Sequence, residues 1–268
     1  MVIRVCVAGA TGWVGRILTR ELLRSEEFQL TGTICRQRVG EDIGLVLGGE
    51  AVGVRTVSVL SEAAPADVLI DFTGPDSVKA RVLEALTRGF RVVIGTSGLT
   101  SEDYDDIARE AENRALGVVA AGNFSVTATL AKRFTLLAAR HIRSCEIIDY
   151  ADPDKPDAPS GTARELAEEL AGISNNVETG STARPDPQEA RGADIAGTRI
   201  HSLRLPSYIL SFEAILGLPN ERLTIRHDAG PGADPYVAGT LMAAREVMRT
   251  TGLVRGLDGL VFQRPDPG

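Results

Sequence analysis

Three glycines, Gly9, Gly12 and Gly15, stand at regular spacing in the segment GATGWVG, directly after the apolar run Val2–Ala8. Glycines placed in this way allow a tight turn, a close approach of backbone to a pyrophosphate, and close packing of a helix on a strand. The amides that open the following helix carry a partial positive charge, which favours a phosphate. The segment therefore predicts a dinucleotide site, and a tight turn that binds nothing is the alternative. The other loop residues assigned to this site are Thr11, Trp13 and Val14.

Two arginines, Arg36 and Arg38, follow the next strand candidate, Phe28–Cys35. Sites for NADH tend to place Asp or Glu at this strand tip, where the carboxylate binds the ribose hydroxyls, and no acid stands here. Arginine can hold the 2′-phosphate of NADPH through charge-assisted hydrogen bonds. We therefore expect NADPH as the cofactor, with NADH as the second candidate. The alternative is that both arginines are solvated surface charges.

Two further turns, FTGP at Phe72–Pro75 and GTSG at Gly95–Gly98, each follow an apolar strand candidate. In an open parallel sheet, ligands bind at the carboxyl ends of the strands. We expect the nicotinamide half of the cofactor at these turns, although both would also serve as ordinary turns. The candidate residues there are Phe72, Thr73, Gly95, Thr96 and Ser97.

A second motif, KPDAPSGTA, begins at Lys155. Thr162 and Glu165 have the spacing of a capping box, so a helix is expected to begin near them. Ser160, Gly161 and Thr162 would offer amides and hydroxyls at its N-terminus, with the Lys155 ammonium just upstream. This arrangement predicts a site for a carboxylate or another small anion. A capped helix beside an exposed lysine is the alternative.

The elements that must position these groups change character along the chain. Strand and helix candidates alternate from residue 2 to residue 121, which predicts a parallel sheet covered by helices. Beyond it we expect a polar loop over residues 174–198 and strands over 199–205, 209–216 and 221–226, hence an antiparallel or mixed sheet. The fold class is therefore α/β: an N-terminal Rossmann domain with a parallel sheet, plus a central α+β domain.

Five segments occur in an order that resembles the dihydrodipicolinate (4-hydroxy-tetrahydrodipicolinate) reductase family. The resemblance implies that residues 1–124 and 233–268 form the dinucleotide domain, and that residues 125–232 bind the substrate and form oligomer contacts. Members reduce an unsaturated cyclic dicarboxylate in lysine biosynthesis with NADPH or NADH. The five segments are Gly9–Gly15, Phe72–Pro75, Gly95–Gly98, Ala121–Val126 and Lys155–Ala163.

The resemblance also implies roles for individual residues. Lys155, Gly161 and Thr162 would bind a substrate carboxylate, and Arg36 would lie beside the adenosine ribose. The residues implied around the pyrophosphate are Gly9, Gly12, Val14 and Gly15. Those implied around the nicotinamide are Gly95, Thr96, Ala121, Asn123 and Phe124.

The chain departs from the family pattern just before the lysine. The family carries two histidines there, one of them regarded as the proton donor, and this chain has Ala151 and Asp152 instead. Alanine cannot donate a proton, and an added carboxylate repels a dicarboxylate. We expect Lys155 to supply the proton, with Asp152, Asp154, Tyr150 or a bound water as other candidates, although both aspartates would also fit a solvated acidic loop. We therefore expect a reductase that acts on a C=N or conjugated C=C bond of a small carboxylate, either the lysine-pathway enzyme or a divergent biosynthetic reductase. The alternative function is a catalytically inactive nucleotide-binding paralogue that acts as a sensor or structural partner.

Composition narrows the classes of partner, metal and cellular compartment that the chain could have. A net charge of −7 without a dense Lys/Arg block argues against nucleic acid or an anionic membrane as a partner. Three scattered cysteines and three histidines show no metal-ligand spacing, so no metal is expected. The cysteines also indicate a reducing compartment, and with no signal peptide visible we expect a cytoplasmic protein. Its partners would be a small carboxylate substrate and copies of itself, in a dimer or tetramer.

Overall fold

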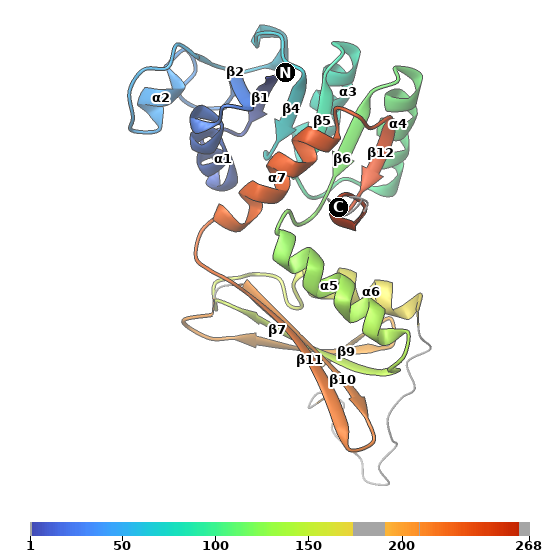
Figure 1. The fold of residues 1–268 in the computed structure, drawn as a ribbon. Coiled ribbons are helices and arrows are strands. Elements are labelled where there is room, and N and C mark those ends of the chain that lie inside the picture. The colour runs from blue at the N-terminus through green and yellow to red at the C-terminus, as the bar shows by residue number, and fades with distance from the viewer. Residues whose placement is uncertain (1, 174–190, 209, 263–268) are drawn as a thin grey trace. The chain divides into compact units, whose positions relative to one another are not determined.

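The chain divides into two compact units. The computed structural model describes residues 2–173, 191–208 and 210–262 (Figure 1). Unit 1 comprises Met1–Val126 and Gly232–Gly268, and unit 2 comprises Thr127–Pro231. None of the helices in these described ranges is both long and apolar enough to cross a membrane.

A seven-stranded sheet forms the centre of unit 1, in the order β12-β6-β5-β4-β1-β2-β3. Every pair of neighbouring strands is parallel, as the alternation of strand and helix predicted. Strands β1, β4 and β6 are almost wholly buried, and each is a mainly apolar run, as expected for parallel strands covered on both faces. Their bounds are β1 Ile3–Ala8, β2 Phe28–Ile34, β3 Thr56–Val57, β4 Val68–Asp71, β5 Arg91–Ile94, β6 Gly117–Ala120 and β12 Gly252–Arg255.

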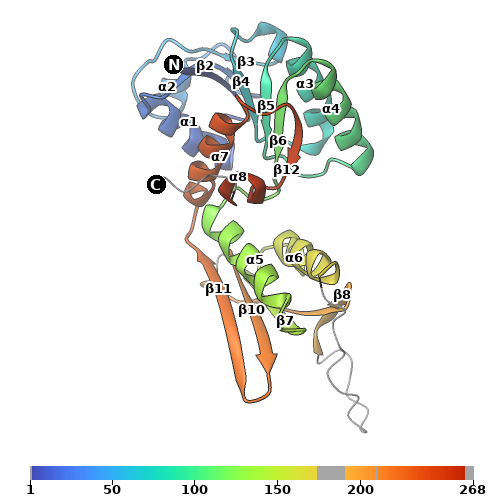
Figure 2. The same cartoon turned by 45° about the vertical axis from the view of Figure 1, so that its right-hand side comes forward.

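Helices cover both faces of this sheet, and each buries one apolar stripe. On one face, Leu18 and Leu22 of α1 are fully buried with residues of α7. On the other face, Val78 and Val82 of α3 pack in a core shared with α4, and Figure 2 shows α3 and α4 side by side. Apolar residues four positions apart lie on one helix face, so this spacing specifies the buried side. The helices are α1 Trp13–Arg24, α2 Ile43–Val46, α3 Pro75–Thr87, α4 Ser101–Asn113, α7 Asp234–Glu246 and α8 Asp258–Phe262, with a 3-10 turn at Leu60–Glu62.

Unit 2 is a five-stranded mixed sheet with two helices on one face. The strand order is β11-β10-β7-β9-β8, and only β7 and β9 run parallel. Ile147, Ala214 and Ile200 of the sheet are buried in a core with residues of α5 and α6. The mixed sheet and the α/β class agree with the sequence prediction. The elements are α5 Val126–Ala139, β7 Ser144–Ala151, α6 Gly161–Ala171, β8 Ala193–Ile195, β9 Thr198–Arg204, β10 Leu210–Leu218 and β11 Glu221–Ala229.

Two expectations for unit 2 need adjustment. The polar stretch 174–198 was expected to be one loop. Residues 174–190 lie outside the described residues, and Ala193–Ile195 form strand β8. Asp194 pairs with Arg199 across the short turn to β9, so pairing with the next strand outweighs the low strand propensity of this polar segment. The expected strand 209–216 is β10, apart from residue 209, which is not described.

Ser207 occupies the position in a type II turn that favours glycine. Tyr208 N donates to Leu205 O at 3.3 Å, and Pro206 and Ser207 are the two central residues. Ser207 has φ 74°, a left-handed conformation that costs a residue with a Cβ about 1–2 kcal/mol.

Replacing Ser207 by glycine should therefore raise the unfolding free energy of unit 2 by about 1 kcal/mol, because glycine adopts positive φ without that cost. The measurement is the urea midpoint of the folded chain, followed by far-UV circular dichroism. Ser207→Ala is the matched control and should give no gain, since alanine keeps the Cβ. A Ser207→Gly midpoint at or below that of the wild type would show that the turn is not strained.

Candidate functional site

The glycine loop of unit 1 connects β1 to α1 and leaves no space for side chains at two of its positions. Gly9 has φ +83°, and a Cβ there would lie 2.2 Å from Phe72 O. A Cβ at Gly15 would lie 2.0 Å from Gly9 O, so the helix packs directly on the turn. No side chain caps α1, whose N-cap is Gly12, so the amides of its first turn are available to an anion.

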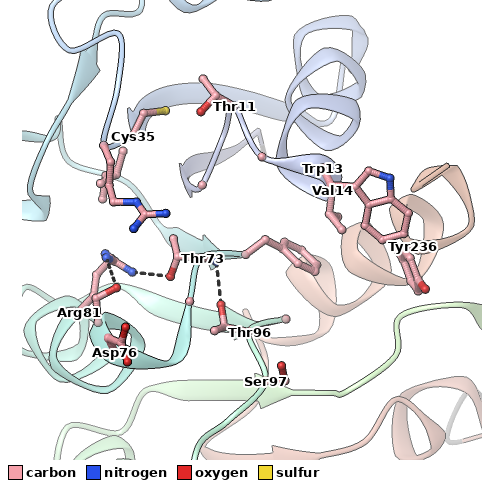
Figure 3. A pocket seen from close by; sticks show the side chains of 18 of the residues that line it. Thr11, Trp13, Val14, Cys35, Thr73, Asp76, Arg81, Thr96, Ser97 and Tyr236 are labelled. Carbon is pink, nitrogen blue, oxygen red and sulfur yellow. Dashed lines mark hydrogen bonds between the residues drawn. The ribbon is translucent and has the colours of Figure 1, made fainter. Parts of the chain in front are cut away.

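A cavity of about 820 Å³ lies at the carboxyl ends of the strands, bounded by this loop (Figure 3). Segments distant in sequence reach it: the tip of β2, the turns after β4 and β5, and the residues after β6. This is the edge at which open parallel sheets bind ligands. Of the residues expected to bind cofactor, those that line the cavity are Gly9, Thr11, Gly12, Trp13, Val14, Arg36, Phe72, Thr73, Gly95, Thr96, Ser97 and Phe124.

Four of the expected cofactor residues do not line it. Gly15 packs α1 against the turn, as described above. Arg38 has φ 62°, and its Nη1 pairs with Glu41 Oε2 at 3.3 Å, so among the two expected arginines only Arg36 lines the cavity. Ala121 N continues the sheet by donating to Ile94 O at 3.1 Å. Asn123 Oδ1 accepts from Ser125 N at 2.8 Å, a turn that leads into α5.

Aromatic rings form part of the cavity wall. Trp13, at the start of α1, lies edge-on to Tyr236 of α7, with ring centroids 5.6 Å apart (Figure 3). Burial raises the pKa of Tyr236, so its hydroxyl remains protonated at neutral pH. Phe72 and Phe124 make a second edge-on pair at 5.7 Å. Tyr236 was not expected here, because α7 follows unit 2 in the sequence and returns to the sheet only in the folded chain.

Three polar residues of α3 that line the cavity were not expected from the sequence. Asp76, Ser77 and Arg81 of α3 line the cavity together with Arg36. Ser77 and Arg81 are four residues apart, so they share one helix face, a spacing that could have identified them. The remaining lining residues that were not expected are Ile34, Cys35, Gln37 and Ser58, whereas Gly74 and Gly122 lie in segments that were expected near the nicotinamide.

In unit 2, the expected anion-binding loop leads directly into α6. The N-cap is Ser160, whose side chain accepts from Ala163 N at 3.3 Å, and the helix begins at Gly161. The expectation of a cap at Thr162 was wrong by one half turn, because Ser160 has the extended conformation that a cap requires. Thr162 instead lies in the first turn. A Cβ on Gly161 would meet no atom within 4 Å, so the backbone is open to a ligand here.

A buried carboxylate, Asp149 of β7, holds this loop in place. Asp149 is 1% exposed, and its Oδ2 accepts from Ser160 N at 2.9 Å and from Arg204 Nη2 at 2.8 Å. Arg204 Nη2 also donates to Asp157 O at 2.7 Å. Arg204 lies on β9, which is why its role was not apparent from the motif alone. These bonds fix the loop at both of its ends.

The two expected catalytic residues lie in one tight turn. Lys155 N donates to Asp152 O at 3.1 Å, and Asp154 N donates to Asp152 Oδ1 at the same distance. The Lys155 ammonium donates to Asp157, which lowers the pKa of that carboxyl. Asp152 is exposed and Ala151 is buried. Asp152 thus closes the turn that presents Lys155.

His227, on β11, contacts residues of its own unit. His227 Nε2 lies 3.0 Å from Thr127 Oγ1, and its ring packs 5.7 Å from that of Phe212. Half-burial lowers the pKa of His227, so the ring is neutral at neutral pH and supplies no positive charge for a carboxylate. Across residues 2–173, 191–208 and 210–262, no three His, Cys, Asp or Glu side chains are grouped to hold a metal ion.

Comparison with known proteins adds a second line of observation. The family model described as dihydrodipicolinate reductase, N-terminus, matches residues 3–124, and that described as dihydrodipicolinate reductase, C-terminus, matches residues 124–260. The 4-hydroxy-tetrahydrodipicolinate reductase of Moorella thermoacetica is 38% identical over 263 residues, covering 97% of this chain and 98% of that protein. The enzyme of the same name from Bacillus pumilus is 35% identical over 266 residues, covering 97% and 98%.

Solved structures of other proteins resemble this chain over most of its length. A dipicolinate-bound dihydrodipicolinate reductase from Paenisporosarcina sp. TG-14 matches with a TM-score of 0.86 and 30% identity, over 97% of this chain and 99% of that one. An amine dehydrogenase from Mycobacterium smegmatis matches with a TM-score of 0.66 at 18% identity, over 96% and 95%, which shows a common fold.

Proposed function

Because the chain belongs to the dihydrodipicolinate reductase family, we propose that it reduces 4-hydroxy-tetrahydrodipicolinate or a closely related cyclic dicarboxylate. It is a pyridine-nucleotide-dependent reductase of that family. The observation that carries the proposal is that the chain has two candidate sites. In unit 1 the glycine loop lies on the wall of the cavity and would bind a dinucleotide. In unit 2 the loop with Lys155 and Ser160–Thr162 would bind a carboxylate.

The cofactor that we propose is NADPH, with NADH accepted more weakly. The nicotinamide ring, when bound, supplies a hydride, and the protein supplies position and a proton. Gly9, Gly12 and the first amides of α1 hold the pyrophosphate, and Arg36 contacts the 2′-phosphate. Gly95, Thr96 and Phe124 line the nicotinamide end. The fit is supported by a cavity of about 820 Å³ and by the first-turn amides of α1, which no side chain caps.

Arg36→Ala should raise the NADPH dissociation constant by about tenfold to a hundredfold, because charge-assisted bonds to the phosphate are lost. The dissociation constant for NADH should hardly change, since NADH lacks that phosphate. Arg38→Ala is the matched control and should alter neither constant, because Arg38 pairs with Glu41 outside the cavity lining. Isothermal titration of both nucleotides measures the ratio, and an unchanged ratio in Arg36→Ala would refute the role of Arg36.

For the substrate, we propose that one carboxylate binds at the N-terminus of α6, on Ser160, Gly161 and Thr162, with Lys155 beside it. Reduction adds a hydride and a proton across a C=N or conjugated C=C bond, and Lys155 is our candidate for the proton donor. Its place in a turn fixed by backbone bonds supports this role. Asp152 is the second candidate, although its carboxylate also accepts from Asp154 N.

The remaining assignments are also proposals. Residues 1–124 and 233–268 would serve the cofactor, and residues 125–232 the substrate and the contacts of a dimer or tetramer. Oligomer contacts are supported by the five-stranded sheet. Helices α5 and α6 pack on the same face of it, so neither helix covers the opposite face, which we propose for contacts with another copy of the chain. A cytoplasmic location is supported by the three cysteines, Cys6, Cys35 and Cys145, which are free thiols.

The activity is tested by following NADPH consumption with 4-hydroxy-tetrahydrodipicolinate and with a panel of other cyclic imines and unsaturated carboxylates. Turnover of any panel member supports a reductase, and the preferred member identifies the substrate. A second function, an inactive nucleotide-binding sensor, is favoured by Ala151 and Asp152, which stand where the resemblance to the family implies two histidines. Tight NADPH binding without turnover of the panel would support that function and exclude the first.

A further inference from the structure

We propose that Arg81 is a positioning residue of the cofactor site, where its ion pair with the buried carboxylate of Asp71 fixes the side chains of Thr73 and Thr96. This inference rests on the cofactor cavity proposed above. It concerns a residue that neither the glycine loop nor the two arginines at the tip of β2 would identify.

Asp71 is the last residue of β4 and is fully buried beneath the two turns. Its Oδ1 accepts from Thr73 N at 3.0 Å, from Thr73 Oγ1 at 2.6 Å, and from Thr96 Oγ1 at 2.8 Å. Thr73 N also donates to Thr96 Oγ1 at 2.8 Å. One carboxylate oxygen therefore ties the turn after β4 to the turn after β5.

Arg81 neutralises the other carboxylate oxygen. Its Nη1 donates to Asp71 Oδ2 at 2.6 Å and to Thr73 Oγ1 at 2.9 Å, and Figure 3 shows the contact with Thr73. Its Nη2 donates to Ser77 Oγ at 3.0 Å, one turn back on α3. The Arg81 side chain is only 15% exposed, so the pair is shielded from solvent. A buried carboxylate without a cation is strongly unfavourable, so the arrangement of Asp71 depends on Arg81.

The consequence reaches the cavity wall through Thr73 and Thr96, both of which line it. If Arg81 is removed, Asp71 must find other partners or water, and the two turns lose their common anchor. Thr73 and Thr96 lie on the part of the wall that both nucleotides share. Loss of Arg81 should therefore weaken the binding of NADPH and the binding of NADH by the same factor, whereas loss of Arg36 should weaken the binding of NADPH alone.

The test measures dissociation constants for both nucleotides in Arg81→Gln, Arg81→Lys and the double variant Arg81→Gln with Asp71→Asn. Trp13 is the single tryptophan and lines the cavity, so quenching of its emission by a reduced nicotinamide reports binding. Arg88→Gln is the matched control, because Arg88 follows the same helix and donates to the backbone oxygen of Ala63.

Arg81→Gln should raise both constants by about tenfold or more and leave their ratio unchanged. Arg81→Lys should lose less affinity for both nucleotides than Arg81→Gln, because the lysine ammonium still compensates the charge of Asp71. The double variant should bind better than Arg81→Gln, since Asn removes the unpaired charge. If Arg81→Gln fails to fold, Arg81→Lys decides the matter: both constants should then exceed those of the wild type by the same factor, and wild-type constants would refute the proposal. Arg88→Gln should leave both constants unchanged.

Two results would overturn the proposal. Wild-type constants in folded Arg81→Gln would show that the anchor is not needed for binding. A change in the NADPH to NADH ratio would show that Arg81 contacts the phosphate itself. Failure of the proposed cofactor site has a different signature, because the wild-type chain would then bind neither nucleotide.

Discussion

Replacing Lys155 by alanine is expected to lower kcat/KM by about a thousandfold, a value typical of the loss of a positioned acid with a charged contact to substrate. The dissociation constant for NADPH should stay at the wild-type value, because Lys155 belongs to unit 2 and the cofactor cavity is lined by residues of unit 1. Steady-state kinetics and nucleotide titration on the same preparation measure the two effects.

Variants at neighbouring positions separate the roles of Lys155. Lys155→Arg keeps a cation for the carboxylate but is a poor proton donor, so it should retain most of the substrate affinity and little of kcat. If Lys155 is the proton donor, Asp152→Asn should retain activity. If Asp152 is the donor, Asp152→Asn should lose as much activity as Lys155→Ala. Lys79→Ala is the control, because Lys79 pairs with Asp103 at 2.7 Å on unit 1. Equal losses of activity and NADPH affinity in Lys155→Ala would show that the anion site is wrongly assigned.

Replacing Gly15 by alanine is expected to weaken NADPH binding by at least about a hundredfold, because moving binding groups by about 1 Å has effects of this size. The added Cβ would lie 2.0 Å from Gly9 O and 2.7 Å from Gly9 C, so the helix must move away from the turn. Isothermal titration measures the affinity, and circular dichroism checks the fold.

Two further glycines frame this prediction. Gly12→Ala places a Cβ 3.1 Å from Gly9 O, a contact that a small shift relieves, so a folded protein with an intermediate loss of affinity is expected. Gly49→Ala is the control, because its Cβ would meet nothing closer than 3.6 Å. Wild-type affinity in Gly15→Ala would contradict the role of the loop as a pyrophosphate cradle.

The parallel sheet and the glycine loop could be predicted because their signals are local. Strands β1, β4, β5 and β6 are short, mainly apolar runs followed by turns, and a buried parallel strand needs no partner-specific pattern. β3 and β12 were not predicted, because two residues, Thr56–Val57, and four residues, Gly252–Arg255, carry too weak a signal on their own. The place of β12 at the edge of the sheet beside β6 depends on the return of the chain to unit 1.

The groups that hold the candidate sites could not be predicted, because their partners are distant in sequence. Asp71 lies ten residues before Arg81, and Asp149 lies 55 before Arg204. A carboxylate inside an apolar strand was the available signal, since such a residue is rarely buried without a partner. Arg38 illustrates the opposite case, a residue expected at the site that does not line the cavity. Its type suited a phosphate, but its positive φ and its bond to Glu41 direct it elsewhere.

The central claim, that this chain delivers a hydride from a bound nucleotide to a cyclic dicarboxylate, is tested most directly by isotope transfer. NADPH carrying deuterium at both C4 positions is incubated with the wild-type chain and 4-hydroxy-tetrahydrodipicolinate, and the product is analysed by mass spectrometry. We predict a reduced product that carries a single deuterium from the cofactor. Reduced product without deuterium, or unreacted substrate in the presence of fully bound NADPH, would contradict the claim.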